Sequence, residues 1–209
     1  MRSLDPDVVA GLQTGRFARR NLIWITAKDR STGDPHSAGF WNGEETVGIP
    51  VIDADTGSSV TRTFKATGGL ISLGPVVLTA DLTIRTAEAR LSPLNSDANQ
   101  YLRGYDLRLA PIQWYRAIFD LETWELVAEG FARFVGFVEK APITTPAAGG
   151  DAEAVLSCVS HTAELTRANP DVRSHQSQQR RGGDGFYRYV DTMADRTVWW
   201  GQNPPQGAS

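Results

Sequence analysis

From residue 21 to residue 159, apolar side chains recur with a period of two, and this alternation limits the fold more than any other feature. Such a period places successive side chains on opposite faces of a β-strand. At residues 21–27 both faces are apolar, with Leu22 and Trp24 on one and Ile23 and Ile25 on the other, which predicts a strand buried on both sides. The alternation predicts strands over residues 21–27, 81–87, 105–118, 124–128, 131–139 and 152–159. Short strands separated by turns are typical of a mainly β fold, so we expect β-barrel or sandwich modules.

A short helix is expected before the first strand, at residues 5–14. Asp5 is a favourable N-cap, Pro6 suits the first helical turn, and Gly15 can end the helix in a left-handed conformation. Inside the predicted strand 105–118, Pro111 lacks the amide donor of a regular ladder and indicates an edge or a bulge.

The period of two ends after the last predicted strand, and the rest of the chain has a different character. We therefore expect two domains: a β-rich core at 1–160, built as one barrel or two small barrel modules, and an extended C-terminal arm at 161–209. Within the arm, residues 173–185 contain no apolar side chain and predict an extended surface loop. Residues 186–193 predict a short helix capped by Asp184.

The sequence lacks the motifs of common catalytic sites. It has no Gly-x-Ser-x-Gly elbow, no His-Glu-x-x-His motif and no phosphate-binding loop. Its three histidines, His36, His161 and His175, lie in separate segments, and the single cysteine, Cys158, excludes an internal disulfide and a cysteine-rich metal site. We therefore predict a protein that is not an enzyme and that uses no cofactor and no metal.

Two polar motifs resemble functional sites only in part. Residues 53–57 (Asp-Ala-Asp-Thr-Gly) resemble the opening of a calcium loop, but the fifth position is Gly57 and the twelfth is Phe64 instead of a bidentate glutamate. They predict a turn between strands. The pair Ser174 and His175 resembles part of a nucleophilic site, but a polar arm does not hold atoms closely enough for catalysis.

The arm carries features of a protein interface. The formal net charge of −3 gives no overall basic field, so nucleic acid is not expected as a specific partner, and no apolar run is long enough to span a membrane. Trp41, Trp114 and Trp124 are expected in the core, whereas arginines and terminal tryptophans favour contact with another protein. The predicted interface residues are Arg173, Gln176, Gln179, Arg180, Arg181, Phe186, Trp199 and Trp200.

Three passages carry a family resemblance. They are the N-terminal helix with the strand at 22–26, the strand series at 85–137, and the arm at 173–186 with the Trp-Gly pair at 200–201. Together they resemble the tail-hub proteins of long-tailed siphophages and gene transfer agents.

The resemblance implies a structural component of the tail tip. Such a protein forms a hub or baseplate ring in the virion, is assembled in the host cytoplasm, and links the tail tube to distal tip or fibre proteins. Hub rings of this kind are three-fold and distal-tail rings are six-fold, so the implied partners are copies of the chain in a trimer or a hexamer, together with neighbouring tail proteins. Two alternatives stay open: a receptor- or carbohydrate-binding tail module with exposed tryptophans and, least favoured, a tail-associated hydrolase.

Overall fold

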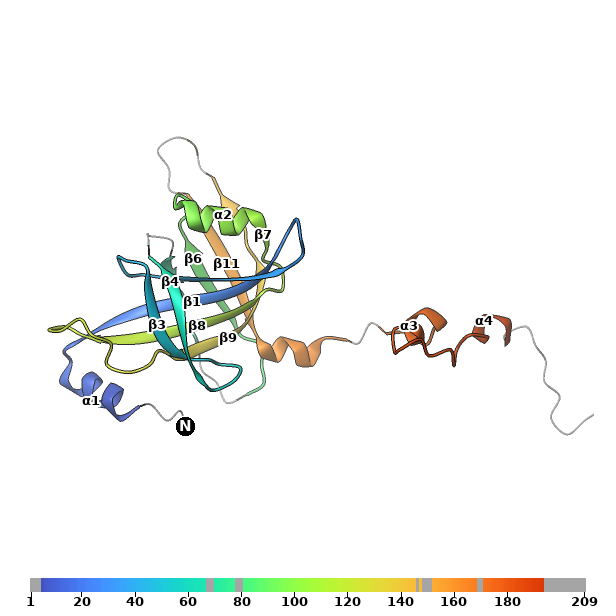
Figure 1. The fold of residues 1–209 in the computed structure, drawn as a ribbon, viewed down its shortest axis with the longest axis horizontal. Helices are drawn as coiled ribbons and strands as arrows, with labels where there is room; N and C mark the ends of the chain where they lie inside the picture. The colour runs from blue at the N-terminus through green and yellow to red at the C-terminus, as the bar shows by residue number, and fades with distance from the viewer. Residues whose placement is uncertain are drawn as a thin grey trace, which may run out of the picture. The chain divides into compact units, whose positions relative to one another are not determined.

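The computed structural model describes residues 5–66, 70–77, 81–145, 147, 152–168 and 171–193 (Figure 1). The chain divides into two compact units, Met1–Thr166 and Arg167–Ser209. The expected core ended at residue 160, but the 3₁₀-helix η1 (His161–Thr166) belongs to the first unit, where it contacts β9 (Phe131–Lys140) and β11 (Glu153–Ser160).

The first unit is mainly β, as predicted. Its described strands form one 11-stranded sheet. The strands lie across the sheet in the order β3-β4-β2-β1-β8-β9-β11-β6-β5. In addition, β7 pairs with β1, and β10 pairs with β11. The β2–β4 pair is parallel and the other pairs are antiparallel. The sheet curls, so that Val51 in β3 forms a bridge with Gly130, just before β9. The strands are β1 (Phe17–Asp29), β2 (Pro35–Trp41), β3 (Val47–Ile52), β4 (Ser59–Lys65), β5 (Leu70–Leu73), β6 (Thr86–Leu91), β7 (Tyr105–Asp106), β8 (Pro111–Asp120), β9 (Phe131–Lys140), β10 (Ile143–Thr144) and β11 (Glu153–Ser160).

The central strands β1 and β8 are buried on both faces. Ile23 lies opposite Trp114 and belongs to the larger core cluster, whereas Leu22 lies opposite Tyr115 and belongs to the smaller one. The two clusters therefore use alternate residues of the same strands. This arrangement confirms the prediction, from its two apolar faces, that the segment 21–27 is buried on both sides.

Helix α1 (Pro6–Thr14) confirms the N-terminal prediction. The Asp5 carboxylate accepts a hydrogen bond from the amide of Asp7 at 2.9 Å, and Gly15 ends the helix with φ of 70°. The segment 105–118 divides into β7 and β8, and Pro111 is the first residue of β8. The prediction of an edge or a bulge at Pro111 is wrong, because β8 lies between β1 and β9 and the register shift of the β8–β9 pair falls between Trp114 and Tyr115. A proline is tolerated at the first residue of a strand.

Two predicted strands are wrong in part. β6 begins at Thr86, and the residues before it, including Leu82 at 77 % exposure, are not in a strand. Alternation over five residues is weak evidence for a strand when no partner offers hydrogen bonds to it. The segment 124–128 makes only an isolated bridge, between Leu126 and Phe119.

Several elements had no prediction, among them β2, β3, β4 and α2 (Ser96–Gly104). α2 lies over one end of the sheet (Figure 1) and packs Ala98, Tyr101 and Leu102 into the larger core cluster. Its N-cap is Asn95, whose side chain accepts from the amide of Ala98 at 3.0 Å.

The described part of the second unit contains two short helices, α3 (His175–Gln179) and α4 (Val190–Met193). The segment 173–185 is therefore not wholly extended, because Ser174 caps α3 by accepting a hydrogen bond from the amide of Ser177 at 3.2 Å. The predicted helix at 186–193 is limited to its last turn. Among the residues that the structure describes, no helix is both long and apolar enough to cross a membrane.

Candidate functional site

The predicted interface residues that the structure describes all lie in the second unit. They occupy α3, the residues around it and the turn before α4. They are Arg173, Gln176, Gln179, Arg180, Arg181 and Phe186. The other two predicted residues, Trp199 and Trp200, lie outside the described residues.

Two carboxylates flank the arginines of this segment. Asp171 approaches Arg180 at 3.8 Å in an exposed ion pair, and Asp184 accepts hydrogen bonds from the Gln178 amide at 2.7 Å and from the backbone N–H of Phe186 at 2.9 Å. These hydrogen bonds, the one from Gln178 foremost, hold the pKa of Asp184 below its usual range. The segment therefore presents both charges, where the sequence at 173–181 showed only cations.

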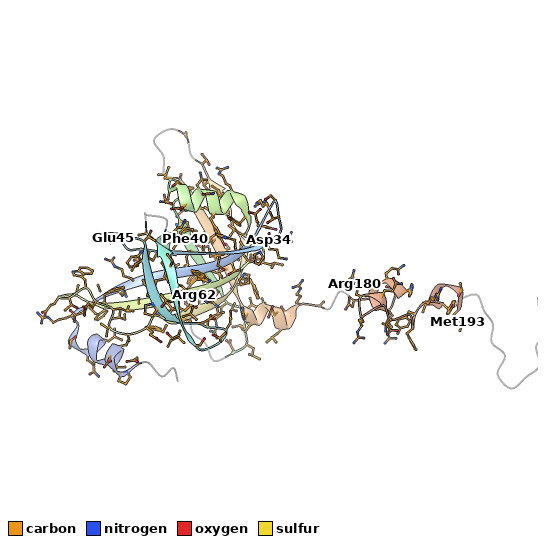
Figure 2. All side chains as sticks on the ribbon, viewed as in Figure 1. Asp34, Phe40, Glu45, Arg62, Arg180 and Met193 are labelled. Carbon is orange, nitrogen blue, oxygen red and sulfur yellow. The ribbon has the colours of Figure 1, made fainter. Side chains whose placement is uncertain are left out.

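The second unit exposes its apolar side chains. No described residue between 171 and 193 is buried, and Phe186 is 78 %, Tyr189 63 % and Met193 55 % exposed. Figure 2 shows the side chains of Arg180 and Met193 projecting from this segment, next to α3 and α4 respectively. Aromatic, methionine and arginine side chains are enriched in protein interfaces relative to the rest of the surface.

The predicted turn at residues 53–57 is confirmed, and it holds a buried polar network. The carboxylate of Asp53 forms an ion pair with Arg62 at 3.0 Å, and both side chains are nearly buried, at 13 % and 12 % exposure. Arg62 also donates to Gln113 at 2.6 Å and to the hydroxyl of Tyr115 at 2.9 Å, while the Gln113 amide donates to Asp55 at 2.7 Å. These carboxylates are thus bonded to protein donors and join the β3–β4 turn to β8.

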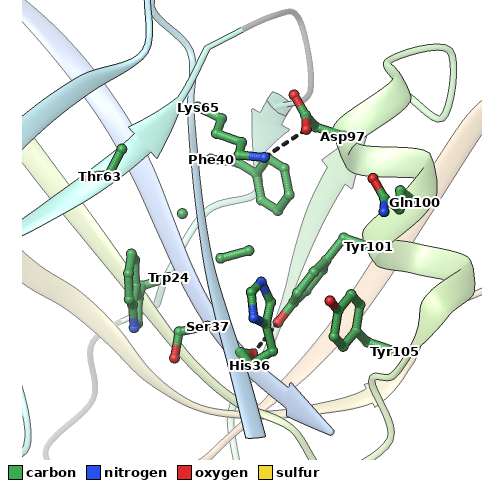
Figure 3. Close-up of a pocket in the computed structure, with 12 residues that line it drawn as sticks. Trp24, His36, Ser37, Phe40, Thr63, Lys65, Asp97, Gln100, Tyr101 and Tyr105 are labelled. Carbon is green, nitrogen blue, oxygen red and sulfur yellow. Dashed lines mark hydrogen bonds and ion pairs between the residues drawn. The ribbon is translucent and has the colours of Figure 1, made fainter. Parts of the chain in front are cut away.

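A hollow of about 460 Å³ lies between β2, β4 and α2 (Figure 3). On one side, Lys65 and Asp97 point toward each other and form an ion pair at 2.7 Å. On the other side, the ring of Tyr105 stacks on those of His36, at 4.9 Å, and Tyr101, at 4.8 Å. In this hollow, the two charged side chains therefore bind each other, and the aromatic rings stack on each other.

Tyr101 fastens α2 to the sheet. Its hydroxyl accepts a hydrogen bond from the amide of Ala27 at 3.1 Å and donates to the carbonyl oxygen of Ile25 at 2.9 Å or of His36 at 3.1 Å. Burial above all raises the pKa of Tyr101 well above its ordinary value. The backbone groups bonded to this hydroxyl belong to β1 and β2, so the side chain ties α2 to the sheet.

Trp124 is exposed, and its prediction as a core residue is wrong. Trp41 and Trp114 are buried as predicted, at 8 % and 1 % exposure, but Trp124 is 58 % exposed with a left-handed φ of 57°. It lines a second hollow of about 460 Å³ together with Glu44, and the guanidinium of Arg20 lies 5.8 Å from its ring. A bulky residue in this backbone region is strained, and such strain concentrates at functional sites.

The three histidines belong to three different elements. His36 lies in β2, His161 begins η1 and stacks on Phe137 at 4.7 Å, and His175 begins α3. Within the described ranges, no three His, Cys, Asp or Glu side chains are grouped so that they could hold a metal ion. The hydroxyl of Ser174 serves as the cap of α3.

No protein-family model matches this chain, and no curated protein matches it.

Sequence reasoning missed both hollows. The hollow beside α2 depends on a helix whose signal was present, since Asn95 precedes an acidic first turn and Ala98, Tyr101 and Leu102 share one helical face. The exposure of Trp124 had no comparable signal, because a turn tip and a buried strand both accept tryptophan.

Proposed function

We propose that this protein is a structural, non-enzymatic subunit of a phage or phage-like tail tip. It forms a hub or baseplate ring in the virion and links the tail tube to distal tip or fibre proteins. Its partners are further copies of the chain, in a trimer by preference or in a hexamer, and the neighbouring tail proteins. The resemblance in the sequence supports the position in the tail, and the second unit supports a role in assembly.

The observation that carries the proposal is the apolar surface of residues 171–193. Phe186, Tyr189 and Met193 are each more than half exposed, and no described residue of this segment is buried. Aromatic side chains that fill a pocket on a partner contribute about 2 kcal/mol or more each to binding. A segment of this composition gains the burial that it lacks when it docks on a neighbouring subunit.

The test is the assembly state of the full chain. We expect native mass spectrometry to show a closed oligomer, and we expect the double variant Phe186→Ser/Tyr189→Ser to weaken it by about a thousand-fold, from about 2 kcal/mol for each aromatic side chain. Leu94→Ser is the matched control, since Leu94 is 82 % exposed in the first unit. A wild-type chain that stays monomeric at micromolar concentration, or an oligomer that the double variant leaves intact, contradicts the proposal.

A receptor- or carbohydrate-binding tail module is the second candidate function, and Trp124 favours it. Its exposed ring stands beside Arg20, Glu44 and Glu45, and exposed aromatic faces with polar neighbours suit sugar rings. Replacing Trp124 by Ala separates the two candidates. Loss of glycan binding with the oligomer intact supports the module, and unchanged binding on a glycan array rejects it.

A further inference from the structure

Three arginines meet at a hollow of about 390 Å³ on the first unit. Arg19 comes from β1, Arg116 from β8 and Arg133 from β9, and Asn21 and Trp114 also line the hollow. The segment that follows β5 forms another wall. The residues of this hollow all belong to the first unit, and the inference does not depend on the function proposed above.

The register of the sheet brings these side chains together. Asn21 pairs with Arg116 across β1 and β8, and Arg19 lies two residues earlier on the same face. β9 is irregular at this point, because Trp114 pairs with Phe134 while the next residue of β8 pairs with Ala132. Arg133 is therefore the extra residue of a β-bulge, which is a means of turning a side chain toward a site.

The positive charge of the hollow has no counter-charge in the described chain. No described Asp or Glu lines the hollow or forms an ion pair with Arg19, Arg116 or Arg133. Burial, followed by the charges of Arg133 and Arg19, lowers the pKa of Arg116. The protein as a whole is acidic, with a net charge of −3, so this is a local concentration of cations on an anionic chain.

Two of the residues that line the hollow also hold a buried donor without a partner. Among the described residues, Arg116 donates from Nη2 to Asn21 at 3.4 Å, but its Nε finds no acceptor. The indole Nε1 of Trp114 is likewise without an acceptor, and Trp114 is only 1 % exposed. Buried donors without acceptors are costly and are rarely left so in a folded protein.

We propose that this hollow binds the phosphate group of an anionic ligand. Three guanidinium groups without carboxylates match a doubly charged oxyanion, and the planar fork of arginine donates two parallel hydrogen bonds to phosphate oxygens. The hollow is larger than a single phosphate ion, which leaves room for the rest of a phosphate ester.

Isothermal titration of the full chain with inorganic phosphate, at constant ionic strength, tests the proposal. We expect saturable binding to one site, weakened about tenfold or more in Arg116→Met and in Arg133→Met, because each removes a charge-assisted hydrogen bond. Arg103→Met is the matched control, since this exposed arginine on α2 lies outside the hollow. Arg19→Met, at an exposed position, serves if the Arg116 variant does not fold.

A second measurement separates binding from a structural role. Without phosphate, Arg133→Met is expected to keep or raise the melting temperature, because it relieves repulsion among like charges. Addition of phosphate should raise the melting temperature of wild type more than that of the variant, since wild type binds the ligand more tightly. The absence of saturable phosphate binding, equal binding by all variants, or tighter binding of succinate than of phosphate overturns the proposal.

Discussion

Replacing Arg62 by Met tests whether the polar network under the β3–β4 turn holds the curled sheet together. Arg62 lies on β4 and contacts Gln113 and Tyr115 on β8, a strand that is not its neighbour in the sheet. Its guanidinium also lies 4.8 Å from the ring of Trp24. The substitution keeps much of the apolar stem and removes the charge, the hydrogen bonds and the cation–π contact.

The expected loss of stability follows from what remains buried. Without Arg62, the carboxylate of Asp53 stays nearly buried and loses its cation, and breaking a buried ion pair in this way costs about 3–5 kcal/mol. Because both side chains keep 12–13 % exposure, we expect the lower end, about 3 kcal/mol. Lys65→Met is the matched control from the same strand, since its ion pair with Asp97 is 46 % and 38 % exposed and contributes at most about 1 kcal/mol.

Urea unfolding followed by far-ultraviolet circular dichroism measures both free energies. The coupling between Arg62 and Asp53 is then read from the double variant Arg62→Met/Asp53→Asn, which should lose less than the sum of the single variants. If Arg62→Met costs no more than Lys65→Met, or if the double variant is simply additive, the reasoning from burial fails.

Three further predictions concern the same unit. Gly136→Ala is expected to cost about 3 kcal/mol in urea unfolding, because its Cβ would collide with a β11 carbonyl oxygen. Gly104→Ala, whose Cβ meets only open space, should be near neutral, and equal effects of the two substitutions would refute this. Tyr101→Phe should cost about 1–3 kcal/mol in the same assay, because it leaves a buried amide of β1 without its acceptor, and no loss would contradict the role given to the hydroxyl. Burial alone raises the pKa of Asp53, but hydrogen bonds and the charge of Arg62 outweigh it, so the folded pKa lies below the unfolded one. The stabilisation by this carboxylate is therefore present above about pH 4 and is lost as pH falls through the folded pKa. Asp53→Asn should therefore unfold more easily at neutral pH yet lose less stability on acidification, and parallel pH profiles would refute this.

Local patterns were enough for the elements that depend on local chemistry. Asp5, Pro6 and Gly15 predicted α1, because caps and turns are decided within a few residues. The two apolar faces of residues 21–27 predicted a strand buried on both sides, because the period of a strand is a property of the strand itself. The turn at residues 53–57 was predictable because a turn, like a cap, is decided within a few residues.

The candidate sites were predictable only in part. The C-terminal segment had a compositional signal, and those of its predicted interface residues that the structure describes lie in the second unit. Trp124 was misplaced, because its exposure depends on a left-handed turn that its neighbours in sequence do not reveal.

The sequence by itself thus determined the mainly β character of this protein, its first helix and the change of character near residue 160. Tertiary structure alone decided which distant groups meet. Arg62 reaches Gln113 and Tyr115 on β8 only because the sheet curls, and Arg19, Arg116 and Arg133 share a hollow only because of strand register and a bulge. The physical reason is that periodicity reports which face a side chain occupies, whereas long-range pairing chooses the neighbours on that face.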